Sequence, residues 1–196
     1  MNKLKLLPLL AFAFIIGCTK EPKTIIQTVT KIDTLYLTKT DTVKIKEFIN
    51  DSTTTVILSR HAETTGVGSD PSLSTAGQER ATELDRLLRN TAIKAVYSTN
   101  FNRTKETASP IATTNNLSTQ QYNPNSLGQF ADLILNQYHN QVVYVAGHSN
   151  TTNVLINQFI GSNKYSIIPE SEYDNLYIVS VSAKGNARVV HLKYGK

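Results

Sequence analysis

Two histidines and two arginines are the residues of this 196-residue chain whose types and positions could do chemistry together. Arg60 and His61 directly follow the run TTTVIL and a serine, His148 follows VVYVAG, and Arg103 comes shortly after AVYS. A neutral imidazole is a nucleophile, and a guanidinium offers a fork of donors that matches phosphate oxygens. Either residue after a strand is often only a polar exit from the core. The combination indicates a pocket for a phosphoryl dianion.

The segments around these residues predict strands that alternate with helices. Short β-branched and apolar runs predict strands, and segments with apolar residues three and four positions apart predict helices. We expect strands at 53–58, 93–99 and 141–148, a turn followed by a helix within 70–90, further helices at 101–116, 125–140 and 149–161, and a C-terminal hairpin around Lys184, Gly185 and Asn186. This order predicts an α/β three-layer sandwich: a mostly parallel sheet with helices on both faces and an antiparallel edge hairpin.

Capping residues refine two of the expected helices. Thr75 and Gln78 have the spacing of a capping box at the start of the first helix, and Gly161 is a C-terminal stop for the last one. The last helix is expected to begin at Ser149, directly after His148, where its N–H groups would favour an anion.

The predicted fold would bring the four reactive side chains together. Ligands of open α/β sheets bind beyond the carboxyl ends of the strands. Each of the four residues follows such an end: Arg60, His61, Arg103 and His148. We therefore expect one anion pocket, walled by two guanidinium groups and two imidazoles, at this edge of the sheet.

Four stretches resemble the histidine phosphatase superfamily, also called the phosphoglycerate-mutase-like family. The stretches are LSRHAET, DPSLSTAGQERA, YSTNFNRTKETASPIA and VAGHSNTTNVLI, and they agree with the family in order and type over nearly all of residues 54–160. The family hallmark RHG appears here as Arg60, His61 and Ala62. The resemblance implies the phosphoglycerate-mutase-like form of the α/β sandwich.

The resemblance also implies a role for each site residue. His61 would attack phosphorus and form a phosphohistidine intermediate, Arg60 and Arg103 would clamp the phosphoryl oxygens, and His148 would complete the pocket. No metal and no other cofactor is expected, because the histidines lack the adjacent ligand spacing of a metal site.

Two features depart from the family pattern. Ala62 replaces the commoner glycine, a mild change unless the position needs a positive φ angle. The expected proton donor is missing: the segment that often carries a glutamate has none, and Ser149 stands where acid phosphatases of the superfamily have an aspartate. Glu63 is one possible substitute, because an extended chain would aim it to the same side as His61. Further candidates are Asp70, Asp132, Glu170, Glu172 and Asp174.

The missing donor leaves alternatives open. A leaving group with a low pKa, as in phosphohistidine or an acyl phosphate, would need no donor. The chain also lacks the inserted segment of phosphoglycerate mutases, which favours hydrolysis of phosphomonoesters or phosphohistidine over mutase activity. The alternative is a catalytically weak or inactive envelope lipoprotein that binds a phosphate ligand. The sequence gives no oligomeric state.

The N-terminal segment predicts a lipid anchor. Lys3 and Lys5 precede an apolar stretch too short to span a bilayer, and IIGC resembles a bacterial lipobox. Cleavage would leave Cys18, the single cysteine, acylated at the membrane. We expect a signal peptide at 1–17, the lipidated cysteine with a Thr- and Lys-rich tether at 18–52, and a phosphatase domain at 53–196 on the periplasmic or cell-surface side of the envelope.

Charge and composition argue against nucleic acid as a partner. The net charge is +5, but the lysines and arginines are scattered and form no basic run interleaved with aromatic residues. We therefore expect a small phosphorylated substrate, with the membrane bound through Cys18.

Overall fold

The structure is a computed structural model that describes residues 53–195. The signal peptide and tether predicted for 1–17 and 18–52, including Cys18, lie outside the described residues. None of the helices described within residues 53–195 has the length and hydropathy of a membrane-spanning segment.

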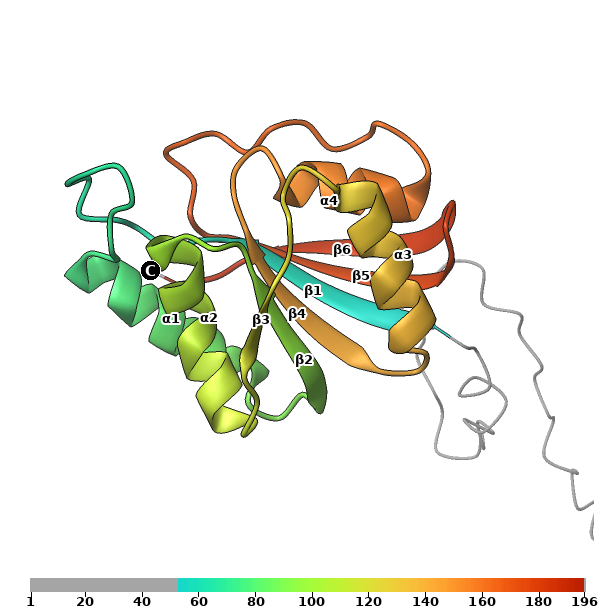
Figure 1. Cartoon of the computed structure of the whole chain (residues 1–196), viewed down its shortest axis with the longest axis horizontal. Helices are drawn as coiled ribbons and strands as arrows, with labels where there is room; N and C mark the ends of the chain where they lie inside the picture. The colour runs from blue at the N-terminus through green and yellow to red at the C-terminus, as the bar shows by residue number, and fades with distance from the viewer. Residues whose placement is uncertain (1–52, 196) are drawn as a thin grey trace, which may run out of the picture. The chain divides into compact units, whose positions relative to one another are not determined.

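The described residues form a mixed sheet of six strands flanked by four helices (Figure 1). In chain order the elements are β1 (Thr54–Arg60), α1 (Thr75–Leu88), β2 (Ile93–Ser98), α2 (Asn102–Thr114), β3 (Thr119–Gln121), α3 (Leu127–Gln137), β4 (Val142–Gly147), α4 (Thr152–Ile160), β5 (Asn175–Ala183) and β6 (Asn186–Lys193). The spatial order is β3-β2-β4-β1-β5-β6. Strands β1 to β4 pair in parallel, whereas β5 and β6 pair antiparallel at one edge.

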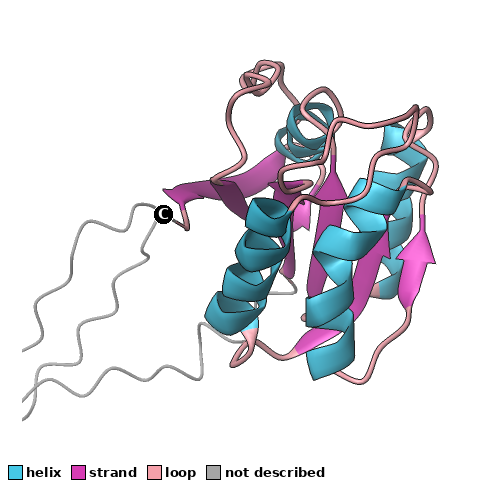
Figure 2. Ribbon diagram, turned by 90° about the vertical axis from the view of Figure 1, so that its left-hand side faces the viewer, coloured by secondary structure: helices cyan, strands magenta, loops and turns pink. Residues whose placement is uncertain are grey.

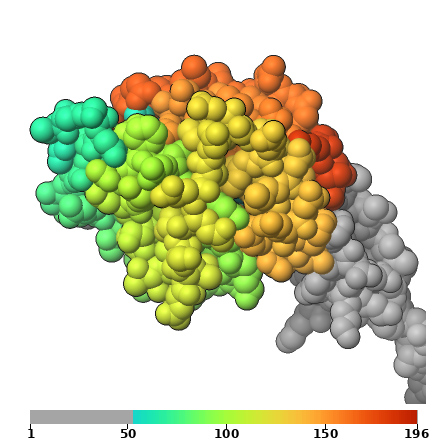
Figure 3. Space-filling view, in the orientation of Figure 1, coloured from blue at the N-terminus to red at the C-terminus, as the bar shows by residue number. Residues whose placement is uncertain are grey.

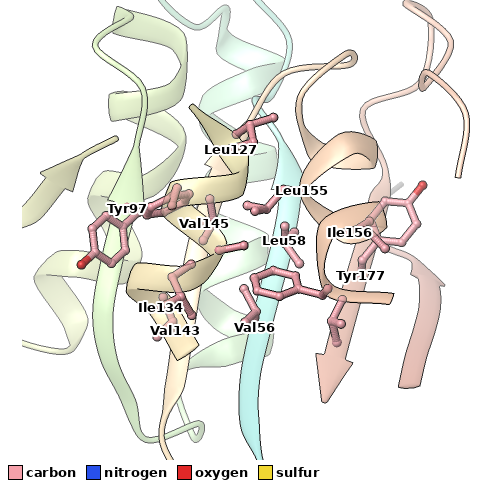
Figure 4. Packing of buried hydrophobic residues seen from close by; sticks show 14 of the residues in the cluster. Val56, Leu58, Tyr97, Leu127, Ile134, Val143, Val145, Leu155, Ile156 and Tyr177 are labelled. Carbon is pink, nitrogen blue, oxygen red and sulfur yellow. The ribbon is translucent and has the colours of Figure 1, made fainter. Parts of the chain in front are cut away.

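Helices cover both faces of the sheet, as Figure 2 shows from the side. On one face, α3 and α4 pack Ile134, Leu155 and Ile156 against Val56 and Val145 of the central strands (Figure 4). On the other face, α1 and α2 pack against alternate residues of the same strands, such as Ile57 and Val96. Alternate residues of β1 face opposite layers and all but Thr55 are buried, so the middle of the strand is a continuous apolar run, Val56, Ile57 and Leu58. The predicted three-layer sandwich is confirmed.

Most element boundaries differ from the sequence prediction by one to three residues, and three differences bear on the site or the topology. The N-cap of α1 is Ser74 and not Thr75, since the Ser74 hydroxyl accepts the Gly77 N–H at 3.1 Å. The helix α4 begins at Thr152 and not at Ser149. The short strand β3 was not predicted, because its sequence TQQ is polar and only three residues long. Gly161 does end α4, with a φ of 67°.

The start of α1 lies unusually close to the chain that follows the site strand β1. A Cβ atom at Gly77 would fall well inside contact distance of the Glu63 backbone carbonyl oxygen, two residues after His61. This close approach requires glycine and links the packing of α1 to the position of the residues after β1.

We predict that Gly77→Ala lowers the free energy of unfolding by about 1–3 kcal/mol, because the backbone must move to admit the methyl group. Denaturant unfolding of the purified variant measures the loss. Gly128→Ala is the matched control. Its Cβ would meet Gln158 at an ordinary 3.5 Å, and alanine in a helix stabilises by up to about 1 kcal/mol. Equal stability of the Gly77→Ala variant and the wild type would contradict the close-packing account.

Candidate active site

The four predicted site residues lie together at the carboxyl ends of three adjacent strands. The order β2-β4-β1 places the ends of these strands side by side. There Arg60, His61, Arg103 and His148 line one open cleft of ≈ 1240 Å³. The loop between α4 and β5 contributes Ile167, Glu170 and Tyr173 to the cleft. This loop belongs to the orange part at the top of the space-filling view (Figure 3). The structure thus brings together the residues that sequence reasoning grouped by strand ends alone.

His61 is held so that one ring nitrogen remains free for chemistry. Its backbone N–H donates to the Gly147 carbonyl at 2.9 Å, which ties the end of β1 to the end of β4. Its Nδ1 lies 2.8 Å from the carbonyl oxygen of Ala62. Because a carbonyl only accepts, Nδ1 carries the proton and Nε2 keeps its lone pair. Burial, together with the charges of Arg60 and Arg103, lowers the pKa of His61 to about 4, so the ring is neutral near pH 7.

His148 faces His61 across the cleft, with ring centroids 5.5 Å apart. Its Nε2 lies 2.8 Å from the Thr99 hydroxyl at the end of β2, and that hydroxyl lies 2.8 Å from the Thr104 hydroxyl on α2. The chain of hydroxyls fixes the ring and leaves Nδ1 as the nitrogen available to a ligand. Burial first, and then the charge of Arg103, lowers the pKa of His148 to about 4.

The Arg60 guanidinium is buried and holds the loop after α4. Its Nη1 donates to three backbone carbonyls, those of Pro169 at 3.1 Å, Glu170 at 2.8 Å and Glu172 at 3.2 Å. The Tyr173 ring stacks over the guanidinium at 4.3 Å. Only Nη2 faces a side-chain anion, the carboxylate of Glu170. Nη2 of Arg60 is therefore the group that could bind a phosphate, while Nη1 remains hydrogen-bonded to the backbone of the loop.

Arg103 enters the cleft from the first turn of α2, where Asp70 orients it. The Asp70 carboxylate accepts the backbone N–H of Asn102 at 2.9 Å and thereby caps α2. The same carboxylate lies 3.5 Å from Nη1 of Arg103. The guanidinium also lies over the Phe101 ring at 4.5 Å. Asp70, one of the candidate donors, is thus engaged in positioning α2 and Arg103 and does not line the cleft.

Glu63, one donor candidate from the sequence, is bound elsewhere. The strand ends at Arg60, so the extended alternation that would aim Glu63 toward His61 does not continue. Its carboxylate accepts three hydrogen bonds from Arg80 of α1, at 2.7–2.9 Å. Partial burial acts to raise the pKa of Glu63, but the Arg80 hydrogen bonds outweigh it and lower this pKa. Glu63 lines a second, smaller cavity beside Arg80 and not the cleft that holds His61.

Of the further donor candidates, Glu170 alone reaches the cleft within the described residues. Its carboxylate accepts from Arg60 Nη2 and from the Ser149 hydroxyl. Asp132 pairs with Lys184 at 2.6 Å, and Glu172 and Asp174 pair with Lys193 at 2.6 and 2.8 Å. The sequence could not separate Glu170 from its two neighbours, because the choice depends on which of them faces Arg60 across 110 residues of chain.

Ala62 stands where the family pattern has a glycine. Ala62 is fully buried and is not among the described residues with a positive φ angle, so alanine fits there without strain.

The helix start that was predicted at Ser149, with free N–H groups facing an anion, is a turn in the structure, because α4 begins at Thr152. In the turn before α4, the N–H groups of Thr151 and Thr152 donate to the His148 carbonyl, and the His148 N–H donates to the Thr151 hydroxyl.

Comparison with known proteins agrees with this geometry. Residues 56–123 match the Histidine phosphatase superfamily (branch 1), which includes the segment from β1 through His61 and Arg103. The match supports a histidine phosphatase superfamily domain. No curated protein sequence matches the chain.

Several solved structures share the fold of this domain. Bacillus stearothermophilus YhfR superposes with a TM-score of 0.59 at 15% identity, covering 70% of this chain and 95% of its own. A mycobacterial glucosyl-3-phosphoglycerate phosphatase gives 0.56 at 13% identity, covering 72% and 99%. A protein from Agrobacterium tumefaciens proposed to be the phosphohistidine phosphatase SixA gives 0.51 at 16%, covering 71% and 97%. At these identities the likeness shows a common phosphoglycerate-mutase-like fold.

The donor set of the cleft fits an oxyanion better than a metal ion. Among residues 53–195, no group of three or more His, Cys, Asp or Glu side chains is arranged to hold a metal. Two guanidinium groups would instead neutralise phosphoryl oxygens beside a neutral imidazole, an arrangement that suits nucleophilic attack on phosphorus.

We predict that His61 and His148 both titrate at about pH 4 in the folded protein, below the ordinary imidazole value of 6.5. Because the unfolded chain binds these protons at higher pH than the folded one, stability falls as the pH drops from about 6.5 toward 4. Imidazole NMR titration measures the pKa values, and unfolding at a series of pH values measures the linkage. His148→Asn should flatten the acid slope, and titration of either ring near 6.5 would contradict the assigned environment.

Proposed function

We propose that this protein is a metal-independent phosphatase that works through a phosphohistidine at His61. The observation that carries the proposal is the state of His61: neutral, with Nδ1 bound to the Ala62 carbonyl and Nε2 free, in a cleft with Arg60 and Arg103. The superfamily match and the phosphatases among the structural neighbours support the same class of reaction.

The geometry supports two successive displacements at phosphorus. In the first, the Nε2 lone pair of His61 forms a bond to phosphorus as the bond from phosphorus to the leaving oxygen breaks. In the second, water attacks the phosphohistidine, the bond from nitrogen to phosphorus breaks, and inorganic phosphate departs. Arg103, His148 and the Nη2 group of Arg60 would stabilise the charge on the transferring group in both steps.

The lining of the cleft favours a substrate with one phosphate and an uncharged polar remainder. Arg60 and Arg103 are the only arginines or lysines among the described residues that line it. The remaining wall is largely neutral and includes four side-chain amides: Asn125, Gln129, Asn150 and Gln158. Amides recognise hydroxyl groups by hydrogen bonds, so a sugar- or polyol-like phosphomonoester fits better than a compound with further anionic groups.

The N-terminal segment supports a place at the cell envelope. The lipobox-like IIGC and the segment from 19 to 52 would hold the catalytic domain near a membrane through acylated Cys18.

We predict that residues 53–196 hydrolyse p-nitrophenyl phosphate in the presence of a chelator and are inhibited by vanadate. His61→Ala should lower kcat/KM by more than about 10³-fold, because it removes the nucleophile. His139→Ala is the matched control, since that histidine is exposed and outside the cleft. Undiminished turnover in His61→Ala would overturn the nucleophile assignment, and phosphate binding without turnover in the wild type would favour an inactive binding protein.

The phosphoenzyme provides a second check on the same assignment. Rapid quench of the wild type with a labelled substrate should trap an adduct that is labile in acid and stable in base, as expected of a phosphorus–nitrogen bond to imidazole. An acid-stable adduct would identify an oxygen nucleophile instead.

We predict that a substrate panel ranks sugar and polyol monophosphates above bisphosphates and phosphoglycerate in kcat/KM, by about tenfold, because a second anionic group finds no cationic partner. Nucleoside monophosphates and a phosphohistidine peptide complete the panel. A preference for bisphosphates would contradict the neutral character assigned to the outer cleft.

A further inference from the structure

The proposed reaction needs a proton for the leaving oxygen, and the cleft offers one carboxyl group to supply it. An alkoxide leaves only if it is protonated as its bond to phosphorus breaks. Neither Glu63 nor Asp70 faces the cleft, since Arg80 binds the first and Asn102 and Arg103 bind the second. Among the described residues that line the cleft, Glu170 alone carries a carboxylate.

The loop that carries Glu170 is fixed on both sides of it. Ile168 is 3% exposed, and its N–H donates to the Ser149 carbonyl at 3.0 Å. On the other side, the Glu172 carboxylate accepts from Asn175 at 2.9 Å and from Lys193 at 2.6 Å. Between these anchors, Arg60 binds the carbonyls of Pro169 and Glu170. The backbone position of Glu170 is thus fixed, whereas its side chain can change conformation.

The carboxylate of Glu170 occupies the position that a phosphoryl group would need. It accepts hydrogen bonds from Arg60 Nη2 and from the Ser149 hydroxyl, two donors that could instead bind a phosphoryl oxygen. Yet its side chain is 74% exposed, so the contact is open to displacement by an incoming dianion. Arg60 also has a buried Nε without a partner, which a phosphoryl oxygen could satisfy.

We propose that substrate displaces the Glu170 carboxylate from Arg60 and Ser149, and that Glu170, protonated as a result, is the general acid of the first step and the general base of the second. This inference rests on the proposed phosphatase function and assigns the proton donor of that reaction. Glu170, the assigned donor, lies on the loop between α4 and β5.

Charge explains why displacement turns this carboxylate into an acid. In the free protein the Ser149 hydrogen bond, followed by the charge of Arg60, holds the pKa of Glu170 below its usual value. A bound phosphoryl dianion takes over these donors and places two negative charges beside the carboxylate, which raises its pKa. The other charged or titratable groups that face this position are His61, His148, Arg103 and Tyr173.

The proton balance closes over the two steps. As Nε2 of His61 bonds to phosphorus, the Glu170 carboxyl gives its proton to the leaving oxygen, and the alcohol departs. Glu170, now a carboxylate, then takes a proton from the attacking water as the oxygen of that water bonds to phosphorus. Neutral His61 is restored when its bond to phosphorus breaks, and Glu170 holds a proton again.

A leaving-group series tests the assignment. In Glu170→Gln, the loss of kcat/KM should grow with the basicity of the leaving group, from p-nitrophenyl to phenyl to alkyl phosphate, and reach about 10²-fold or more for the alkyl ester. Glutamine keeps the size and hydrogen-bonding oxygen of the side chain but has no proton to give. Thermal unfolding of the variant confirms that it is folded.

Glu172→Gln is the matched control, because it changes a carboxylate of the same loop whose partners are Lys193 and Asn175. A loop that is merely loosened should lower the rates of all three esters by the same factor in both variants. If Glu170→Gln shows such a uniform loss, the donor assignment is wrong although the phosphatase function stands. If the wild type hydrolyses none of the esters, the proposed function itself fails.

Binding of tungstate to the full chain gives a readout that needs no turnover. Tungstate is fully deprotonated near neutral pH, so proton uptake on binding reports on protein groups. The wild type should take up one proton more than Glu170→Gln, and its affinity should fall more steeply with rising pH, by up to about tenfold per pH unit for one linked proton. Equal uptake in the two proteins would overturn the displacement and protonation of Glu170.

Discussion

Arg60, at the end of β1, is positively charged and only 3% exposed. The groups around the cleft are arranged to compensate this buried charge. A buried guanidinium is stable only where anions and carbonyl oxygens replace its water. The loop after α4 supplies three carbonyls to Nη1, the Tyr173 ring covers the face, and Glu170 closes the remaining side at Nη2. A phosphoryl group would therefore enter a site where the compensation already exists, and would replace its one movable part.

Burial and the nearby arginines also control the protonation state of His61 and His148. Removal of water and the nearby guanidinium groups disfavour the imidazolium form, which leaves both rings neutral near pH 7. For His61 this is the reactive form, and the Ala62 carbonyl decides which nitrogen bears the proton. The arginines that would bind the substrate thus also help to keep the His61 ring neutral. Binding of a dianion and activation of the imidazole depend on one charge distribution.

The sequence was sufficient for what depends on local pattern and strand order. Apolar runs predicted β1, β2 and β4, and the rule that ligands bind at strand ends placed His61, Arg103 and His148 in one cleft. It was insufficient where long-range contacts decide. Arg80 lies 17 residues from Glu63 and draws its carboxylate away, and Arg60 selects Glu170 from a loop 110 residues later. The polar strand β3 pairs in parallel with β2, a contact that its own sequence does not indicate.

A donor on the loop after α4 has a consequence for how the reaction begins. A carboxylate held between Arg60 and Ser149 is a poor acid, and a carboxyl already protonated in the free protein would leave Arg60 Nη2 without its anion. Both requirements are met only if protonation follows binding. Because the dianion takes the two donors and adds repulsion, substrate itself creates the acid that its leaving group needs. A ligand too small or too weakly charged to displace Glu170 would find no general acid, so the contact that stabilises the empty cleft also discriminates among ligands.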